Sequence, residues 1–133
     1  MSITLDSKTD HRGSLYPFNL HEALSFTPKR LFFIRDVPAG TVRGHHAHIN
    51  TTQVLLCVAG LIEVHMENET EKKVHRLFPG DYVLETPMTW TSMNFVTNDS
   101  ILLVLSSEVH NEADYIRDIE TYRNMLKKRA END

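Results

Sequence analysis

Three of the eight histidines of this 133-residue chain, His45, His46 and His48, fall within four consecutive positions. On a β-strand, a period of two places the imidazoles of His46 and His48 on the same face. An imidazole, with a pKa near ~6.5, accepts and returns a proton near neutral pH. We therefore expect a functional pocket in which His46 and His48 transfer protons, most naturally next to a carbonyl group. The alternative is a half-buried strand that carries these histidines by chance.

The surrounding residues resemble the first conserved motif of the cupin superfamily. They follow the pattern Gly40-x5-His46-x-His48-x4-Gln53-x6-Gly60, and cupins usually have a glutamate at the position of Gln53. The resemblance implies a jelly-roll barrel with a pocket at this strand.

A metal site is poorly supported. In cupins a third histidine would follow Pro87, but residues 87–94 contain none. Catalytic zinc takes three protein ligands, and non-haem iron favours two histidines and a carboxylate. We therefore expect no metal and no other cofactor, although another histidine can complete a site through folding. The candidates are His45, His65, His75 and His110.

Four short motifs resemble those of the dTDP-4-keto-6-deoxyglucose 3,4-ketoisomerases, and the similarity covers about residues 3–124. The resemblance implies a metal-independent isomerase that serves the synthesis of 3-amino-3,6-dideoxy sugars for surface glycans, such as lipopolysaccharide O-antigen and S-layer glycans. It also implies a homodimer that exchanges N-terminal strands. The motifs are Asp10-x-Arg12-Gly13-x-Leu15, Arg43-Gly44-x-His46-Ala47-His48-x4-Gln53, Pro87-Met88-x-Trp90-x-x-Met93 and Asp114-Tyr115-Ile116-Arg117.

The mechanism implied by this resemblance runs through an enediol. His48 removes the proton at C3 of the 4-keto sugar, and reprotonation at C4 leaves a 3-keto sugar. His46 moves a proton between the two oxygens or orients the sugar ring. Which of the two histidines is the base stays open at this point.

Side chains for binding the dTDP-linked keto sugar come from several motifs. Arg43 either holds the pyrophosphate, stabilises the enediolate or forms a surface salt bridge. Arg12 is a second phosphate candidate, or it stabilises its turn through an ion pair. Gln53 binds a sugar hydroxyl, positions a histidine or fills the former metal position. Trp90 stacks on the substrate or belongs to the core. The other candidates are Ser14, Phe33, Thr91 and Met93.

The chain departs from the family pattern at three places. The residue after the tryptophan is commonly histidine or arginine and helps to set the configuration at C4, but Thr91 is neither acid nor base. Ser14 occupies a position that varies with the product. Several members have tyrosines where this chain has Phe32 and Phe33. The configuration at C4 therefore stays open.

Three other functions remain as alternatives. A dTDP-4-keto-sugar 3,5-epimerase uses one histidine base with a tyrosine acid, and the close pair of His46 and His48 fits the ketoisomerase better. A metal-dependent cupin enzyme would bind iron, zinc or manganese. A non-catalytic nucleotide-sugar-binding cupin is supported by Thr91, because the usual histidine or arginine is missing there.

Composition indicates one soluble domain over residues 1–133. A net charge of −4 and a pI near 6.0 provide no electrostatic basis for binding nucleic acid or an anionic membrane. The N-terminus has no pattern of a secretion signal, and no apolar run is long enough to span a bilayer. Together with the single cysteine, Cys57, these features predict a cytoplasmic protein.

Apolar runs separated by turn residues predict eight or more short strands and therefore an all-β cupin jelly roll, a double-stranded β-helix. We expect residues 53–59 and 61–66 to pair as a hairpin around Gly60. From Glu112 onward, apolar residues at steps of three and four predict an amphipathic C-terminal α-helix over about residues 112–130.

Overall fold

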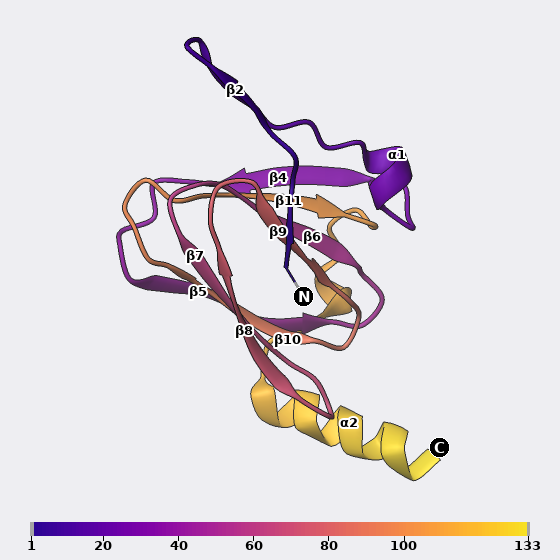
Figure 1. Ribbon diagram of the computed structural model, residues 1–133. Coiled ribbons are helices and arrows are strands. Elements are labelled where there is room, and N and C mark those ends of the chain that lie inside the picture. Colours follow the sequence, from indigo (N-terminus) through magenta and orange to yellow (C-terminus); the bar gives the residue numbers. More distant parts are fainter. Residues whose placement is uncertain (1, 133) are drawn as a thin grey trace.

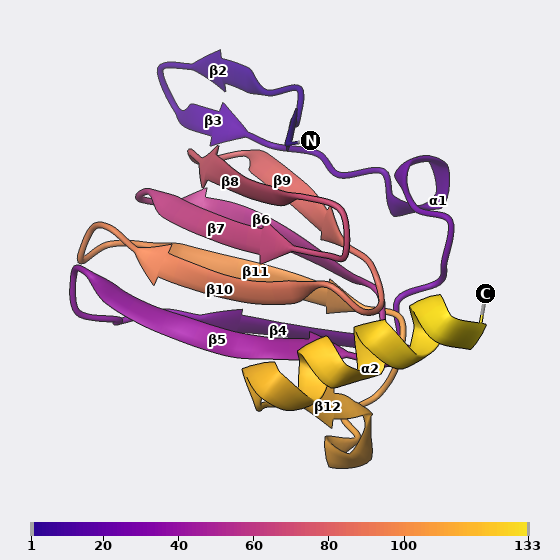
Figure 2. The same ribbon diagram turned by 90° about the horizontal axis from the view of Figure 1, so that it is seen from below.

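The structure is a computed structural model that describes residues 2–132. Two five-stranded antiparallel sheets face each other and form a flattened barrel, as Figure 1 shows. A two-stranded hairpin and a C-terminal helix lie outside the barrel, on different sides of it (Figure 2). The expected all-β jelly roll with a C-terminal helix is confirmed.

The first sheet has the order β1-β9-β6-β11-β4 and the second the order β12-β5-β10-β7-β8. The strands of the first are Ile3–Thr4 (β1), Asp81–Glu85 (β9), Gln53–Ala59 (β6), Ile101–Ser106 (β11) and Arg30–Ile34 (β4). Those of the second are Tyr115–Ile116 (β12), Thr41–His48 (β5), Trp90–Phe95 (β10), Ile62–Glu67 (β7) and Lys72–Leu77 (β8). The other elements are Lys8–Asp10 (β2), Gly13–Leu15 (β3), Leu20–Ala23 (α1), the 3₁₀ turn Glu112–Asp114 (η1) and Ile119–Asn132 (α2).

Apolar side chains fill the space between the sheets because alternate residues of each strand face inward. On β10, Thr91, Met93 and Phe95 are buried, while the residues between them lie on the outer face. Cys57 is also fully buried in this core, as expected. Any cavity between the two sheets is therefore lined by inward-facing residues of the same strands.

The predicted hairpin of residues 53–66 is wrong. Strands β6 and β7 lie in different sheets, and β7 pairs with β8 and β10 instead. Gly60, with φ at +76°, lies where the chain crosses from one sheet to the other. A side chain there would collide with Thr97 and Ser100, so glycine is required by space as well as by backbone conformation.

The predicted start of the C-terminal helix, near residue 112, is also wrong. Residues 112–116 form η1 and β12, and Tyr115 and Ile116 pair with His48 and Ala47 of β5. Helix α2 begins only at Ile119, where Asp118 accepts a hydrogen bond from the backbone N–H of Thr121 at 2.9 Å. Ile116 matched the spacing expected of a buried helix face because its side chain is indeed buried. It belongs to a strand, however, and not to a helix.

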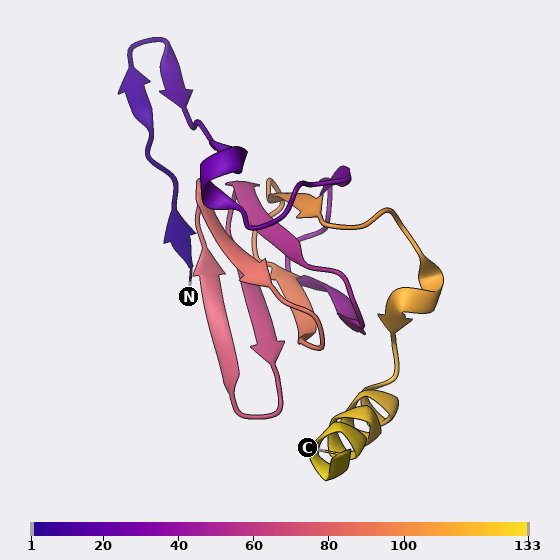
Figure 3. The same cartoon turned by 90° about the vertical axis from the view of Figure 1, so that its right-hand side faces the viewer.

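The β2–β3 hairpin pairs only with itself and projects from the barrel, most visibly in Figure 3. Every residue from Asp6 to Pro17 is exposed. Within the described part of the chain, neither helix is long and apolar enough to cross a bilayer.

Candidate active site

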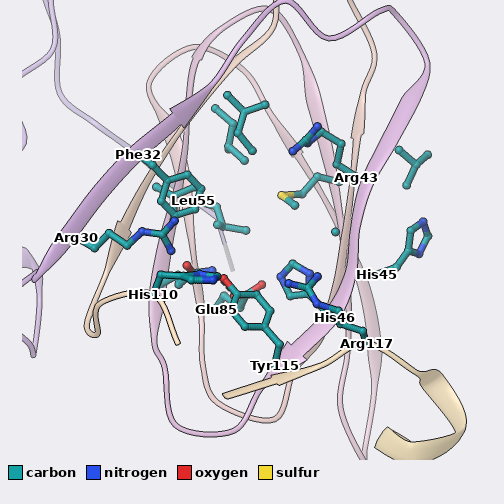
Figure 4. Close-up of a pocket in the computed structure, with 17 residues that line it drawn as sticks. Arg30, Phe32, Arg43, His45, His46, Leu55, Glu85, His110, Tyr115 and Arg117 are labelled. Carbon is teal, nitrogen blue, oxygen red and sulfur yellow. Dashed lines mark hydrogen bonds between the residues drawn. The ribbon is translucent and has the colours of Figure 1, made fainter. Parts of the chain in front are cut away.

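A cavity of about 440 Å³ opens between the two sheets. Its apolar floor is continuous with the core, through Leu55, Met93, Leu102 and Val104. Polar side chains surround the space above this floor, as Figure 4 shows. They are Arg30, Arg43, His45, His46, Gln53, Glu85, His110, Tyr115 and Arg117.

The cavity carries excess positive charge although the chain is acidic overall. Arg117 donates to Glu112 at 2.6 and 3.0 Å, so its charge is partly balanced. Within residues 2–132, Arg30 and Arg43 have no carboxylate partner, and the guanidinium of Arg30 stacks over Phe32 at 4.4 Å. Unpaired guanidinium groups in a recess fit an anionic ligand such as a pyrophosphate.

An irregularity in β5 sets the histidines in place. The pairing of β5 with β10 shifts by one residue, so His46 lies opposite Thr91 and Gly44 lies opposite Ser92. Gly44 and His45 have positive φ angles of +97° and +59°. A Cβ on residue 44 would lie 2.9 Å from the backbone oxygen of Thr91, so only glycine fits this bulge.

After the bulge, the imidazoles of His46 and His48 lie on the same face of β5, as the strand period of two predicts. Their rings meet edge to face, with centroids 5.1 Å apart. His46 is half-buried and lines the cavity. Burial, followed by the neighbouring His48 and Arg117, lowers the pKa of His46 to about 4. His46 is therefore a neutral imidazole at physiological pH, which is the state a general base needs.

His48 lies deeper than His46, and its side chain is only 3% exposed. His46 lines the cavity, whereas His48 lines a recess of about 10 Å³ that shares Arg30, Gln53, His110 and Tyr115 with the cavity. Its Nδ1 is 3.6 Å from Oδ2 of Asp114, and its Nε2 is 3.4 Å from Nε2 of Gln53. Burial lowers the pKa of His48, against the opposing effect of Asp114. His46 is thus the more accessible of the two imidazoles, and which of them is the base stays a prediction.

Gln53 and Glu85 form a buried pair next to His48. They lie directly opposite each other on β6 and β9, and Gln53 Nε2 donates to Glu85 Oε1 at 2.8 Å. Burial is the main cause that raises the pKa of Glu85. Sequence reasoning missed Glu85, although a carboxyl at an inward position of an apolar strand is a recognisable signal.

Tyr115 stands at the centre of the polar wall. Its ring centroid is 5.1 Å from that of His46, 4.4 Å from that of His48 and 5.4 Å from that of His110. The guanidinium of Arg117 lies 4.4 Å above the same ring. Strand β12 carries Tyr115 to this place by pairing with β5 at His48.

Several sequence-predicted site residues lie elsewhere. Arg12 and Ser14 are in the projecting hairpin, where Arg12 pairs with Asp10 at 2.7 Å. Phe33 points to the outer face of β4 and is 60% exposed, because Phe32 takes the inward position. Trp90 packs on Tyr122 of α2 outside the cavity, with ring centroids 5.5 Å apart.

Of the remaining predicted residues, Arg43, Gln53 and Met93 line the cavity. Thr91 is fully buried behind the wall, where its hydroxyl donates to the backbone oxygen of Thr89 at 3.4 Å and lies near the carboxyl of Glu85. Tyr115 and Arg117 stood in a recognised motif but were given no role, and the alternation of β4 would have indicated Arg30. Sequence reasoning thus gave no role to four cavity residues: Arg30, Glu85, Tyr115 and Arg117. His45 and His110, named only as possible metal ligands, also line the cavity.

The side chains of the cavity do not fit a metal ion. Within residues 2–132, no three His, Cys, Asp or Glu side chains converge as ligands. At the position of the usual cupin glutamate, Gln53 directs its amide nitrogen toward His48. An N–H group cannot ligate a cation, so this donor set does not support the metal-dependent alternative.

Comparisons with known proteins identify the family of this chain. A family model described as "FdtA: WxcM-like, C-terminal" matches residues 1–127. The TDP-4-oxo-6-deoxy-alpha-D-glucose-3,4-oxoisomerase of Aneurinibacillus thermoaerophilus is 29% identical over 120 residues, which are 90% of this chain and 86% of that protein.

Among solved structures, QdtA, a sugar 3,4-ketoisomerase from Thermoanaerobacterium thermosaccharolyticum in complex with TDP, has a TM-score of 0.88 and 32% identity. The match covers 97% of this chain and 95% of QdtA. A histidine-to-asparagine mutant of that enzyme was solved in complex with TDP-4-keto-6-deoxyglucose. The rmlC epimerase of Mycobacterium tuberculosis has a TM-score of 0.75, covers 86% of this chain and 66% of its own, and at 16% identity shares the fold alone. The chain therefore belongs to the family of sugar-nucleotide 3,4-ketoisomerases.

Proposed function

We propose that this protein isomerises dTDP-4-keto-6-deoxyglucose to a dTDP-3-keto-6-deoxyhexose without a metal or other cofactor. The observation that carries the proposal is a neutral imidazole, His46, on the wall of a cavity that also holds the unpaired guanidinium groups of Arg30 and Arg43. The cationic groups suit the pyrophosphate, and the imidazole suits proton transfer at carbon.

In this mechanism His46 is the base. It removes the proton from C3 of the 4-keto sugar, and the electron pair of the broken bond forms the enediol. The imidazolium then returns a proton to C4, while the hydroxyl proton moves from O3 to O4. The phenol of Tyr115, in contact with His46, is suited to that second transfer. Arg43 or Arg117 stabilises negative charge on the enediolate.

His48 acts behind His46 as a positioning group. Its ring packs edge-on against that of His46, and a positive charge on it would oppose protonation of His46. The sequence-based roles of the two histidines are therefore exchanged in this proposal: His46 meets the sugar, and His48 holds the base in place.

We further propose a homodimer that exchanges N-terminal segments and works in the cytoplasm. The hairpin that carries Arg12 and Ser14 has no strand partner in its own barrel, and Leu31 and Phe33 leave an apolar outer face on the edge strand β4. In such a dimer Arg12 would reach the cavity of the other subunit. A 3-keto product suits amination at C3, and so the synthesis of 3-amino-3,6-dideoxy sugars for surface glycans.

One observation favours a second candidate, the 3,5-epimerase. Such an enzyme pairs one histidine base with a tyrosine acid, and the rings of His46 and Tyr115 are neighbours in the cavity. The family assignment favours the ketoisomerase, and the following experiment separates the two reactions.

The purified, chelator-treated protein is incubated with dTDP-4-keto-6-deoxyglucose in deuterium oxide, and the sugar is followed by NMR. A ketoisomerase produces a 3-keto sugar, and the NMR spectrum gives its configuration at C4 directly. Deuterium enters at C4 if the abstracted proton exchanges with solvent before it is returned. Exchange at C3 and C5 without migration of the carbonyl would identify an epimerase. An unchanged sugar would contradict both enzymatic functions for this substrate.

A further inference from the structure

The mechanism proposed above gives no role to the buried carboxyl of Glu85. Glu85 is 2% exposed, yet it borders the cavity and touches the pair formed by Gln53 and His48. Burying a carboxyl without a role is unfavourable, because desolvation costs several kcal/mol, on the order of the net stability of a small domain. The contacts of Glu85 indicate what it does.

The first contact sets the orientation of the Gln53 carboxamide. A carboxamide can be turned by 180°, which exchanges its oxygen and its NH₂ group. Because Glu85 Oε1 lies 2.8 Å away as an acceptor, the NH₂ group of Gln53 faces Glu85. The same nitrogen is 3.4 Å from Nε2 of His48, so its second hydrogen is directed at the imidazole.

This orientation frees the other end of the amide. With both N–H groups directed at Glu85 and His48, the carbonyl oxygen of Gln53 has no hydrogen-bond partner within residues 2–132. Gln53 borders the cavity, and that oxygen is not among the fully buried orphan atoms. It is therefore an available acceptor for a hydroxyl group of a bound ligand.

The remaining contacts fix Glu85 itself. Its carboxyl also lies near the side chain of Thr91, which is on β10 of the opposite sheet. The carboxyl is thus held between two sheets, with one oxygen accepting from Gln53. A protonated carboxyl satisfies both contacts, and a glutamine at position 85 could satisfy them in the same way.

We propose that Glu85 is a positioning residue that orients the Gln53 carboxamide so that its carbonyl oxygen accepts a hydrogen bond from a hydroxyl of the sugar. The pair then distinguishes a hydroxylated sugar from the bare nucleotide, while the arginines bind the pyrophosphate of both. This inference rests on the proposed function only in taking a nucleotide sugar as the ligand.

The test uses binding without turnover. The dissociation constants of TDP and of the unreactive TDP-glucose are measured by calorimetry for the wild-type protein and for Glu85→Ala, Glu85→Gln and Gln53→Ala. One neutral hydrogen bond corresponds to a factor of roughly 2–10 in affinity. We expect Glu85→Ala and Gln53→Ala to lower the affinity for TDP-glucose by this factor and to leave the affinity for TDP unchanged. Glu85→Gln should retain most of the wild-type affinity for TDP-glucose.

Two additional variants make the result decisive. Adding Glu85→Ala to Gln53→Ala should lower the affinity for TDP-glucose no further, because both changes remove one interaction. Ser100→Ala is the matched control, since Ser100 is a buried hydrogen-bonded residue outside the cavity. It should lower thermal stability without changing the ratio of the two dissociation constants.

The inference is overturned if Glu85→Ala lowers the affinities for TDP and for TDP-glucose by the same factor, since that result would indicate general damage to the fold. It is also overturned if Glu85→Gln is as defective as Glu85→Ala, or if neither change alters the ratio. Failure of the wild-type protein to bind TDP at all would instead contradict the proposed function.

Discussion

The imidazoles of His46 and His48 meet at an interplanar angle of 89°; His46 lines the main cavity, and His48 lines only a small recess beside it. His48 is enclosed by Asp114, Gln53 and Glu85. Two histidines that are equivalent by strand periodicity therefore differ in what they can touch, and the difference leads to separate predictions for the two.

Replacing His46 should remove the chemical step while leaving the nucleotide bound. We expect His46→Asn to lower kcat by about 10²–10⁴-fold, the usual contribution of a general base, with little change in the affinity for TDP. His48→Asn should lower kcat less and lower the melting temperature more, because His48 is almost fully buried. His65→Asn, at an exposed position outside the cavity, is the control. A larger loss of kcat in His48→Asn would restore His48 as the base.

The pKa of His46 predicts at which pH kcat/KM falls on the acid side of its pH profile. Because it is lowered from 6.5 to about 4, kcat/KM should stay level through neutral pH and fall only as the pH approaches 4. A limb centred near 6.5 in the pH profile of kcat/KM would show that an unperturbed histidine is the base.

The same shift predicts a change in stability with pH. The folded-state pKa of His46 lies below the unfolded value, so protonation favours the unfolded state. The contribution of His46 is constant above 6.5 and is lost progressively as the pH falls from 6.5 toward 4. The free energy of unfolding of wild type minus that of His46→Asn should therefore decrease over this range. A difference independent of pH would contradict the shift.

Arg30 and Arg43 are expected to bind the pyrophosphate. A charge-assisted hydrogen bond contributes about 1.5–3 kcal/mol, so Arg30→Ala or Arg43→Ala should weaken TDP binding by about 10- to 100-fold. The affinity of the wild type should also fall with added salt more steeply than that of either variant. Arg35→Ala serves as the control, because Arg35 pairs with Asp36 outside the cavity. Equal losses in all three variants would argue against a pyrophosphate site.

The bulge at Gly44 should be sensitive to a single methyl group. In Gly44→Ala the new Cβ would meet the oxygen of Thr91 and the side chain of Met93, at 2.9 and 3.1 Å, and would also strain the backbone. Gly40→Ala is a matched control, with a positive φ of +83° but no atom within 4 Å. We expect Gly44→Ala to lower the melting temperature more than Gly40→Ala and to reduce kcat as well. Equal effects would mean that only the backbone conformation matters.

The proposed exchange of N-terminal segments can be tested by mixing two defective proteins. His46→Asn lacks the base, and Arg12→Ala lacks the arginine that would reach the other subunit. After co-refolding equal amounts, half of the dimers are mixed and each contains one intact site, so activity should recover to about a quarter of the wild-type level. No recovery would indicate that Arg12 acts within its own subunit, and full activity of the Arg12→Ala protein alone would show that Arg12 has no role.

The local patterns of the sequence were sufficient for the strands and for the shared face of the two histidines. Strand periodicity is a property of neighbouring residues, so His46 and His48 come together whatever else the chain does. The apolar runs likewise predicted strands over residues 53–59 and 61–66, close to the observed bounds of β6 and β7. The quoted motifs, which cover most of the chain, identified the family.

Only the tertiary structure decided which residues form the cavity, because that depends on contacts between distant strands. Contacts with Asp114, Gln53 and Glu85 bury His48 and leave His46 on the cavity wall. Strands β6 and β9 join Gln53 to Glu85 across 32 positions of sequence. Pairing with β5 turned the expected start of a helix into a strand that delivers Tyr115. Spacing along the chain carries no information on these pairings, since each is set by how the two sheets pack.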